Sequence, residues 1–338
     1  MNYKGEYGMT VSLCVVAYNE ERFLPTLLDD LKNQTYSHKA TEIILVDGGS
    51  EDSTKKIMSD FKKEYESDYI AIKVLDNPKR NQAAGWNVAI TNATSDVIIR
   101  IDAHTRIPTT FTEKNILLQE AGEFVTGGVR PCLIEEPTPW RETLLEVENA
   151  LFGSGIADSR HCDKKKYVKS MFHAAYRRSV FDRVGLFNEK LLRTEDNEMH
   201  YRIRKAGYKL CFDPEIISYQ FARSSLKKMI KQKYGNGYWI GITIGICPKC
   251  TSVYHFVPCV FVCAIIFTTL LWILGIWQLA CLMWSAYFIF TLVSMFITIK
   301  NGKWNRWTFC MPFLFLILHI CYGVGTLVGL FNIKKLWK

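Results

Sequence analysis

Apolar positions follow two alternating periods along the first hundred residues. Val11–Ala17 is a continuous apolar run typical of buried strands, and Glu20–Asn33 repeats Phe and Leu at helical spacing. Further strand patterns cover Glu42–Val46, Ile70–Leu75 and Asp96–Ile101, and further helical patterns cover Asp52–Tyr65 and Asn81–Thr91. Repeated strand–helix units predict an α/β domain with a mainly parallel sheet that helices cover on both faces.

The C-terminal third contains a long apolar run. No Lys, Arg, Asp or Glu occurs between Thr251 and Ile299, and a second apolar run follows a short basic loop at residues 300–306. The length of these runs and their lack of charge favour membrane spans over buried helices of a soluble protein. We expect about three transmembrane helices, at residues 253–274, 276–299 and 307–331.

A helical pattern at Ser224–Ile240 leads into this region. One face carries Leu226, Met229, Ile230 and Tyr234, and the other carries Lys227, Lys228 and Lys231. This arrangement predicts an amphipathic helix lying in the membrane interface, with an ordinary surface helix as the alternative. The expected organisation is therefore a first domain at 1–222, an interfacial linker at 223–250 and a transmembrane region at 251–338.

The charge distribution changes what the net charge of +9 means. From Gly241 to Lys338 there are seven Lys or Arg and no acidic residue, so the basic excess lies in the apolar tail. This points to a membrane and not to nucleic acid. The polar start has no signal-peptide core, which predicts a cytosolic first domain. Three crossings would then place the basic C-terminus outside, against the positive-inside tendency, unless one segment is re-entrant.

Acidic turns follow three of the expected strands, beginning at Tyr18, Asp47 and Asp102. Because parallel strands end at one sheet edge, "YNEE", "DGGSEDS" and "DAH" should meet there, where ligands of such sheets bind. Helix N-caps are the alternative for the first two. No G-x-G-x-x-G follows the first strand and no P-loop motif occurs, which argues against dinucleotide and P-loop binding.

A fourth acidic segment, "TEDNE", begins at Thr194 and opens a helical pattern. Acidic residues near a helix N-terminus are stabilised by the helix dipole, so capping is one explanation. Three carboxylates in four residues exceed what a cap needs. Two of them held together could supply a general base.

Six motifs occur in the order and spacing of family-2 glycosyltransferases: "VAYNEE", "EIILVDGGSEDST", "NPKRNQAAGWNVAI", "VIIRIDAHTR", "FHAAYRRSVFDRVGLFNE" and "TEDNEMHYRIRKAG". The chain resembles this family from about Val11 to Gly237, and most of all its membrane-attached members of the succinoglycan glucosyltransferase type. The resemblance implies a GT-A fold with a Rossmann-like sheet, a nucleotide-diphosphate sugar donor and an inverting single displacement.

The same resemblance implies roles for individual donor-site residues. Ala17, Tyr18 and Glu20 would line the base and ribose pocket, and Asp47 would pair with the base, which we expect to be uracil. Arg80 would meet phosphate, although a solvated Lys–Arg pair is the alternative for "KR".

The reaction centre follows from the remaining motifs. Asp102 corresponds to the first acid of the family's Asp-x-Asp, and His104 replaces the second acid, the usual direct metal ligand. An imidazole ligand suits Mn²⁺ better than Mg²⁺, so manganese is the expected cofactor. Asp196 matches the catalytic base, with Glu195 beside it. "QKYGNGYW" only loosely resembles the motif of processive members, which favours addition of one sugar per encounter.

These expectations combine into one function and two alternatives. The chain is expected to transfer a sugar to a lipid-linked saccharide in capsule, wall or exopolysaccharide synthesis, at the cytosolic face of the membrane. Polyprenyl phosphate itself is the alternative acceptor, and a catalytically silent membrane scaffold is the alternative class. A scaffold would have no need for the retained acids Asp47, Asp102, Glu195 and Asp196.

Overall fold

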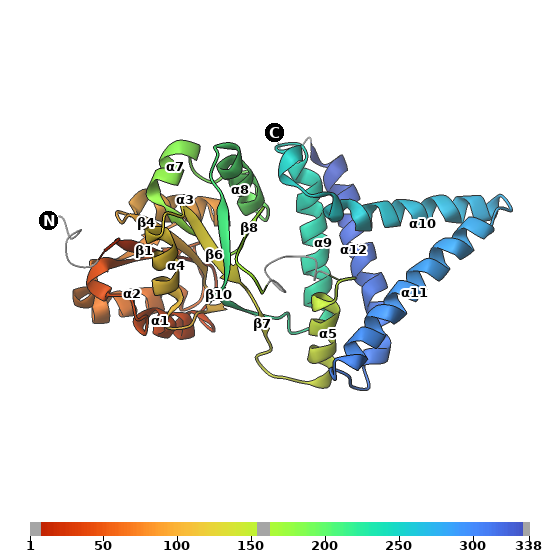
Figure 1. Cartoon of the computed structure of the whole chain (residues 1–338), viewed down its shortest axis with the longest axis horizontal. Coiled ribbons are helices and arrows are strands. Elements are labelled where there is room, and N and C mark those ends of the chain that lie inside the picture. Colours follow the sequence, from red (N-terminus) through yellow and green to blue (C-terminus); the bar gives the residue numbers. More distant parts are fainter. Residues whose placement is uncertain (1–7, 154–162, 334–338) are drawn as a thin grey trace. The chain divides into compact units, whose positions relative to one another are not determined.

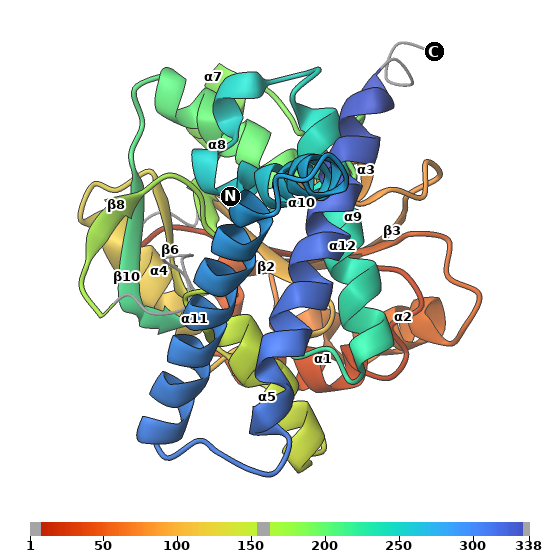
Figure 2. The same cartoon turned by 90° about the vertical axis from the view of Figure 1, so that its right-hand side faces the viewer.

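The computed structural model describes residues 8–153 and 163–333. The chain divides into two compact units, the first comprising residues 1–131 and 161–221 and the second comprising residues 132–160 and 222–338. The segment 132–160 thus groups with the C-terminal helices and interrupts the continuous first domain that the sequence suggests. Figures 1 and 2 show both units.

Unit 1 is built on a mixed sheet. In its described part the strand order is β3-β2-β1-β4-β9-β6-β10-β8. The strands are β1 (Val11–Ala17), β2 (Thr41–Asp47), β3 (Ala71–Asp76), β4 (Val97–Asp102), β6 (Val125–Val129), β8 (Lys166–Val168), β9 (Ala175–Arg177) and β10 (Leu210–Ile217). β8 and β9 run antiparallel to their neighbours and the others run parallel. The expectation of a mainly parallel sheet is confirmed.

Helices cover both faces of this sheet (Figure 1). Along β1, Leu13 and Val15 pack with α1 (Leu24–Lys32), α2 (Thr54–Tyr65) and α4 (Phe111–Glu120), while Cys14 and Val16 face the opposite layer. That layer contains α3 (Gln82–Asn92), α7 (Arg178–Val184) and α8 (Glu195–Lys205). Alternating side chains of a buried strand face opposite layers, which explains the unbroken apolar run. Short elements complete the unit: η2 (His38–Ala40), η3 (Glu66–Asp68), β5 (Thr105–Arg106) and β11 (Tyr219–Phe221).

Unit 2 is mainly helical. It contains β7 (Cys132–Leu133), α5 (Pro139–Asn149), α9 (Leu226–Thr243), η4 (Pro248–Cys250), η5 (Val253–Phe256), α10 (Val257–Ile273), α11 (Gln278–Lys300), η6 (Thr308–Cys310) and α12 (Met311–Phe331). Among the described residues, three helical stretches are long and apolar enough to cross a membrane, judged by length and composition: Val253–Ile273, Gln278–Lys300 and Thr308–Phe331. On α9, Met229 is buried and the three lysines at 227, 228 and 231 are exposed, as the amphipathic pattern predicts, whereas Tyr234 of the predicted apolar face is 40% exposed.

Candidate active site

The loops after β1 and β2 are joined by hydrogen bonds. Parallel pairing sets Ala17 opposite Asp47, and the Gly48 amide donates to the Ala17 carbonyl at 2.8 Å. Asn19 has a left-handed backbone with φ of 54°. Its amide donates to Ser50 Oγ at 3.0 Å and its Oδ1 accepts from the Glu51 amide at 2.8 Å. Two of the sequence-predicted acidic turns therefore form one surface at the carboxyl edge of the sheet.

Within this surface Asp47 orients its own turn. Its carboxylate is 2% exposed and accepts the amides of Gly49 at 3.1 Å and Ser50 at 3.2 Å. A carboxylate has about four acceptor positions, so these bonds leave capacity for a ligand edge. Ala17 is also buried and contributes backbone only, whereas Tyr18 is 53% exposed.

Arg80 lies against the same loop. A Cβ added to Gly49 would come within 2.8 Å of Arg80 Nε, so only glycine lets the guanidinium rest there. Gly49 also needs glycine because its φ is 81°. The loop that carries Arg80 is tied to β2, since the Asn77 amide donates to the Asp47 carbonyl at 2.8 Å. The predicted donor-site residues Tyr18, Asp47 and Arg80 thus lie on adjoining loops.

Asp102 ends β4 and contacts a histidine that the sequence analysis did not single out. His173 Nε2 lies 3.1 Å from Asp102 Oδ2, and Gln82 Nε2 donates to Oδ1 at 3.4 Å. The other imidazole nitrogen of His173 lies 2.8 Å from Ser218 Oγ. Burial alone would raise the pKa of Asp102, but His173, with smaller contributions from His104 and Arg100, outweighs burial and holds that pKa far below its usual range. Asp102 is therefore an anion at neutral pH.

His104 pairs with an acid from the β1 loop. Its Nδ1 lies 3.1 Å from Oε1 of Glu20. Among the described residues, no group of three or more His, Cys, Asp or Glu side chains is placed to hold a metal ion. Asp102 and His104 together offer one carboxylate and one imidazole at a strand end, a donor set that suits manganese. An ion there would take its other ligands from a diphosphate or from water.

The acidic pair Glu195–Asp196 opens α8. Glu195 is 4% exposed, and its Oε1 lies 3.6 Å from Nη2 of Arg100. The Arg100 guanidinium lies 4.5 Å from the ring centres of both Trp86 and Phe187. Arg100 and Asp102 are two residues apart on β4 and project from the same face of the sheet. This face therefore brings the "DAH" and "TEDNE" motifs into one electrostatic environment.

The environment of the pair favours proton uptake. Burial, reinforced by the neighbouring Asp196 charge and opposed by Arg100, raises the pKa of Glu195 to about 7. Burial likewise raises the pKa of Asp196, while Arg100 and Arg130 oppose the shift and Asp102 adds to it. Carboxyl groups with raised pKa values are stronger bases when ionised, as general catalysis requires.

A neutral histidine anchors the helix behind the pair. His200 is fully buried, with Nε2 2.7 Å from the Tyr176 hydroxyl and Nδ1 3.0 Å from Ser170 Oγ. Burial lowers the pKa of His200 to about 3, so the ring is uncharged at neutral pH. These bonds fix α8 to β9 and to the segment before it.

Sequence reasoning missed Arg100, Arg130 and His173 as site residues. Arg100 had a detectable signal, because a lone charge inside the apolar strand pattern "VIIRID" requires a buried partner. His173 had a weaker one: it lies in a motif of the family resemblance, and its left-handed φ of 46° is visible only in the structure.

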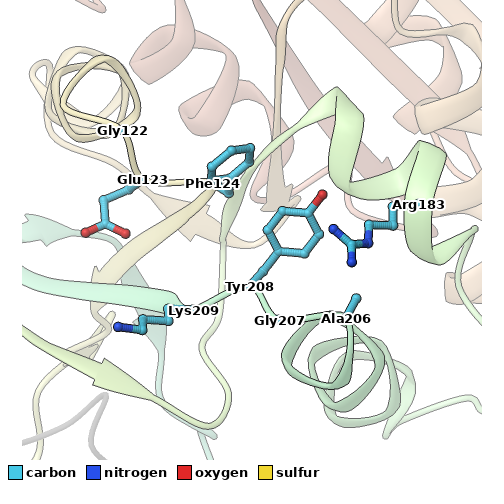
Figure 3. A pocket seen from close by; sticks show the side chains of 8 residues that line it. All are labelled: Gly122, Glu123, Phe124, Arg183, Ala206, Gly207, Tyr208 and Lys209. Carbon is cyan, nitrogen blue, oxygen red and sulfur yellow. The ribbon is translucent and has the colours of Figure 1, made fainter.

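A cavity of about 480 Å³ lies elsewhere in unit 1. Figure 3 shows its lining, in which Phe124, Tyr208 and Arg183 gather where the chain enters β6 and β10. Because β6 and β10 run parallel, this cavity is at the amino ends of the strands, the edge opposite the acidic motifs. No sequence-predicted site residue lines it.

Comparison with known proteins connects this geometry to chemistry. The model of "Glycosyl transferase family 2" matches residues 12–185, and the model of "Glycosyl transferase family 21" matches residues 156–330. A Methanococcus voltae dolichyl N-acetyl-alpha-D-glucosaminyl phosphate 3-beta-D-2,3-diacetamido-2,3-dideoxy-beta-D-glucuronosyltransferase is 26% identical over 244 residues, which is 69% of this chain and 74% of that protein. The succinoglycan biosynthesis protein ExoA of Rhizobium meliloti is 28% identical over 239 residues, 69% of each chain.

The fold has a solved counterpart. Mannosyltransferase PcManGT from Pyrobaculum calidifontis, solved with GDP-Man and Mn²⁺, superposes with a TM-score of 0.59 at 17% identity, covering 95% of this chain and 88% of that one. At this identity the likeness speaks for the fold alone, and the resemblance and GT-A fold expected from the sequence are confirmed. With the family model matching more than half of its length, the chain is a glycosyltransferase and belongs to glycosyl transferase family 2.

Proposed function

We propose that this glycosyltransferase moves a sugar from a UDP-sugar to a lipid-linked saccharide, with inversion and with a divalent cation, at the cytosolic face of a membrane. The observation that carries the proposal is the placement of Arg100 between two acidic positions. Asp102, two residues along β4, and Glu195, 3.6 Å from the guanidinium, both act on this one charge. Such an arrangement serves a reaction in which a diphosphate departs on one side and a proton leaves on the other.

Donor binding is assigned to the joined β1 and β2 loops. Tyr18 offers an exposed aromatic face for a base or ribose, and Glu20 follows on the same loop, where its amide donates to Thr54 Oγ1 at 2.8 Å. Asp47 offers its remaining acceptor capacity to the edge of the base. Arg80, exposed on the adjoining loop, supplies a positive charge for phosphate.

Asp196 is assigned the role of general base. It would take the proton from the acceptor hydroxyl while the acceptor oxygen attacks the anomeric carbon from the face opposite the leaving diphosphate, which inverts that centre. The raised pKa of Asp196 makes the ionised carboxylate a more effective base. Glu195, held toward Arg100, keeps the pair in position.

Asp102 and His104 would hold a divalent cation, Mn²⁺ in preference to Mg²⁺. When bound, the cation supplies Lewis-acid stabilisation of the diphosphate leaving group. The chain's own contribution is an ionised Asp102, kept so by His173, and an imidazole two residues further on.

The acceptor assignment rests on the apolar helices and the relatives. Unit 2 places long apolar helices in the same chain as the catalytic unit, as a lipid-borne acceptor requires. The name of the Methanococcus voltae relative specifies a dolichyl-linked sugar phosphate as its acceptor, and ExoA acts in succinoglycan synthesis. The proposed partners are therefore a nucleotide sugar, a lipid-linked saccharide and membrane lipid.

The decisive experiment measures release of nucleoside diphosphate by the full chain in membranes. UDP- and GDP-sugars would be tested with Mn²⁺, alone, with a lipid extract, and with purified polyprenyl phosphate. We expect UDP release that requires the lipid extract. Stimulation by polyprenyl phosphate alone would identify polyprenyl phosphate, and not a lipid-linked saccharide, as the acceptor. Normal nucleotide binding without turnover of any donor would favour a silent scaffold.

A further inference from the structure

We infer that only the α10–α11 hairpin inserts into the bilayer, and that α12 lies on the membrane surface with α9 and α5. The partner of the hairpin is the lipid hydrocarbon, and the chain would end on the side of the membrane where it begins. This inference concerns the anchor and is independent of the proposed chemistry.

Exposure separates α12 from the hairpin. Within α12, only Phe313, Val324 and Phe331 are exposed, and the other side chains are buried or half-buried. By contrast, every residue from Trp272 to Leu279, at the tip of the hairpin, is exposed, and none of them is charged. A contiguous exposed apolar surface of this extent marks a site of contact with a membrane or another apolar partner.

The apolar residues of α12 have protein partners instead. Leu314, Phe315 and Leu318 form one cluster with Leu144 and Val147 of α5, to which Met229 of α9 and Met295 of α11 also belong. The hydropathy of α12 is thus explained by burial in unit 2 and does not require lipid. Among the three apolar stretches, this one has the largest buried share, 39% against 17% and 22%.

A glycine seam fixes the direction of α9 along α12. A Cβ added to Gly237 would meet Thr326 Oγ1 at 3.0 Å, and one added to Gly241 would meet the Leu330 amide nitrogen at 2.7 Å. Residue numbers rise together on both helices, so they run parallel, and the contact continues into the last turn of α12. Figure 2 shows the two helices side by side. Small residues that let two backbones approach in this way hold the two helices side by side.

The hairpin leaves α12 near the middle of that helix. A Cβ added to Gly323 would lie 2.6 Å from Val262 Cγ2, so the start of α10 crosses α12 near Gly323. The α11 helix returns to the middle of α12, where Tyr287 and His319 hydrogen bond at 2.9 Å, and its later residue Met295 joins the cluster that contains Met311. Between these contacts α10 and α11 extend away from α12, as Figure 1 shows.

These contacts conflict with three single crossings. If α12 crossed the bilayer, α9 would cross beside it, and α10 would begin near mid-depth, because it meets α12 at Gly323. The α11 helix also meets α12 at mid-helix, at His319, so neither arm of the hairpin could then make a full crossing. The conflict disappears if α9 and α12 lie on one membrane surface and the hairpin enters the bilayer from that surface.

The positions of charged residues also argue against a crossing by α9 and α12. The exposed lysines 227, 228 and 231 lie on α9, and Lys233 on the same helix is buried 3.5 Å from Glu148 of α5. Lys303 and Glu146 pair at 3.2 Å near the start of α12. Lysines are costly at membrane depth, while at the surface they attract anionic headgroups.

The hairpin tip is suited to hydrocarbon. Gly275 has a φ of 89°, and its amide donates to the Trp272 carbonyl at 2.9 Å. The Ile276 amide donates to the Leu271 carbonyl at 2.9 Å, so the turn satisfies these donors internally. At 1.5 Å per residue, the parts of α10 and α11 between Val262 and Tyr287 are about 18 Å and about 15 Å long, so the hairpin reaches roughly half of the ~30 Å core of a bilayer.

The test is the side from which engineered cysteines react in sealed membrane vesicles. Single cysteines would replace Lys205 in unit 1, Asn301 after α11 and Asn332 after α12, in an active background lacking native cysteines. A membrane-impermeant maleimide should label all three from the same side. Labelling of Asn332→Cys only from the side opposite Asn301→Cys would overturn the inference.

A second measurement leaves the native cysteines in place. An epitope added after Lys338 of the otherwise unaltered chain should be removed by protease applied from the side that also digests unit 1. Protection of the epitope under that treatment, with loss only after the vesicles are opened, would contradict the inference even if the cysteine-free background did not fold.

Discussion

Arg100 Nη2 lies 3.6 Å from Oε1 of Glu195, and this ion pair links the strand that ends in Asp102 to the helix that carries Asp196. The pair is buried, with side-chain exposures of 10% and 5%. The guanidinium also lies 4.5 Å from the ring centres of Trp86 and Phe187. Two motifs about ninety residues apart in the sequence therefore both interact electrostatically with the Arg100 guanidinium.

Replacing the assigned base should separate chemistry from binding. Asp196→Asn removes the proton acceptor but keeps the shape, so transfer should fall by roughly 10²–10⁴-fold. Donor affinity, measured by calorimetry, should stay within a few fold. Because the folded-state pKa of Asp196 is raised, its ionisation destabilises the fold as pH rises through that pKa, so the variant should not melt below the parent at pH 8.

A matched change on the same helix controls for disturbance of α8. Glu198 pairs with Arg202 at 2.7 Å, away from the acidic pair, so Glu198→Gln should retain most transfer activity. Full turnover by Asp196→Asn would remove this residue as the base.

The pH dependence of sugar transfer should follow the ionisation of the acidic pair Glu195–Asp196. Since Asp196 must be ionised to accept a proton, kcat/KM should rise with pH, with a midpoint above the ordinary carboxyl value of 3.8. Arg100 lowers the pKa of both acids, so Arg100→Gln should move that rise to higher pH. Arg100→Lys keeps the charge and should move it less. An unchanged midpoint in Arg100→Gln would show that the pair does not control the rate.

Metal preference should depend on His104. An imidazole ligand suits Mn²⁺, so activity in Mn²⁺ should exceed that in Mg²⁺, and His104→Asp should shift the preference toward Mg²⁺. Affinity of the donor-bound protein for Mn²⁺, followed by electron paramagnetic resonance, provides a reading apart from turnover. Equal activity with both ions before and after the substitution would exclude His104 as a ligand.

The seam between α9 and α12 should tolerate no added side chain. Gly241→Val would force overlap with the Leu330 backbone, and overpacking of this kind costs about 1–3 kcal/mol. We expect a lower melting temperature in detergent. Val324→Leu adds volume at an exposed position of α12, the helix that faces Gly241, and should leave the melting temperature unchanged. Equal effects of both variants would mean that the helices are not in close contact.

Much of unit 1 was predictable because its sequence signals are local. β1 has the bounds that its apolar run predicts, and β2 extends its predicted strand by one residue at each end. α1 begins at Leu24 rather than Glu20, because Glu20–Phe23 form a turn and Pro25 suits the first turn of a helix. Parallel strand ends then brought the acidic loops together as expected.

Other features depend on contacts between distant segments, which no local period reveals. No helix was predicted at α5, although Leu144 and Val147 form an apolar face, because the α12 side chains that cover this face lie some 170 residues later in the sequence. The pairing of His173 with Asp102 likewise joins β4 to a loop about seventy residues away. The prediction of a span at α12 rests on composition, whereas the inference of a surface helix rests on its contacts with α9 and α5. Burial against protein and burial in lipid select the same side chains.

The interruption of unit 1 by residues 132–160 has a practical consequence for producing the catalytic part alone. A chain shortened after Phe221 would retain α5 but lose every later helix of the cluster that covers Leu144 and Val147. Its apolar face would then be open to water and prone to self-association. A soluble catalytic fragment would need polar substitutions on α5, or a short linker in place of residues 132–160, as well as removal of the C-terminal helices.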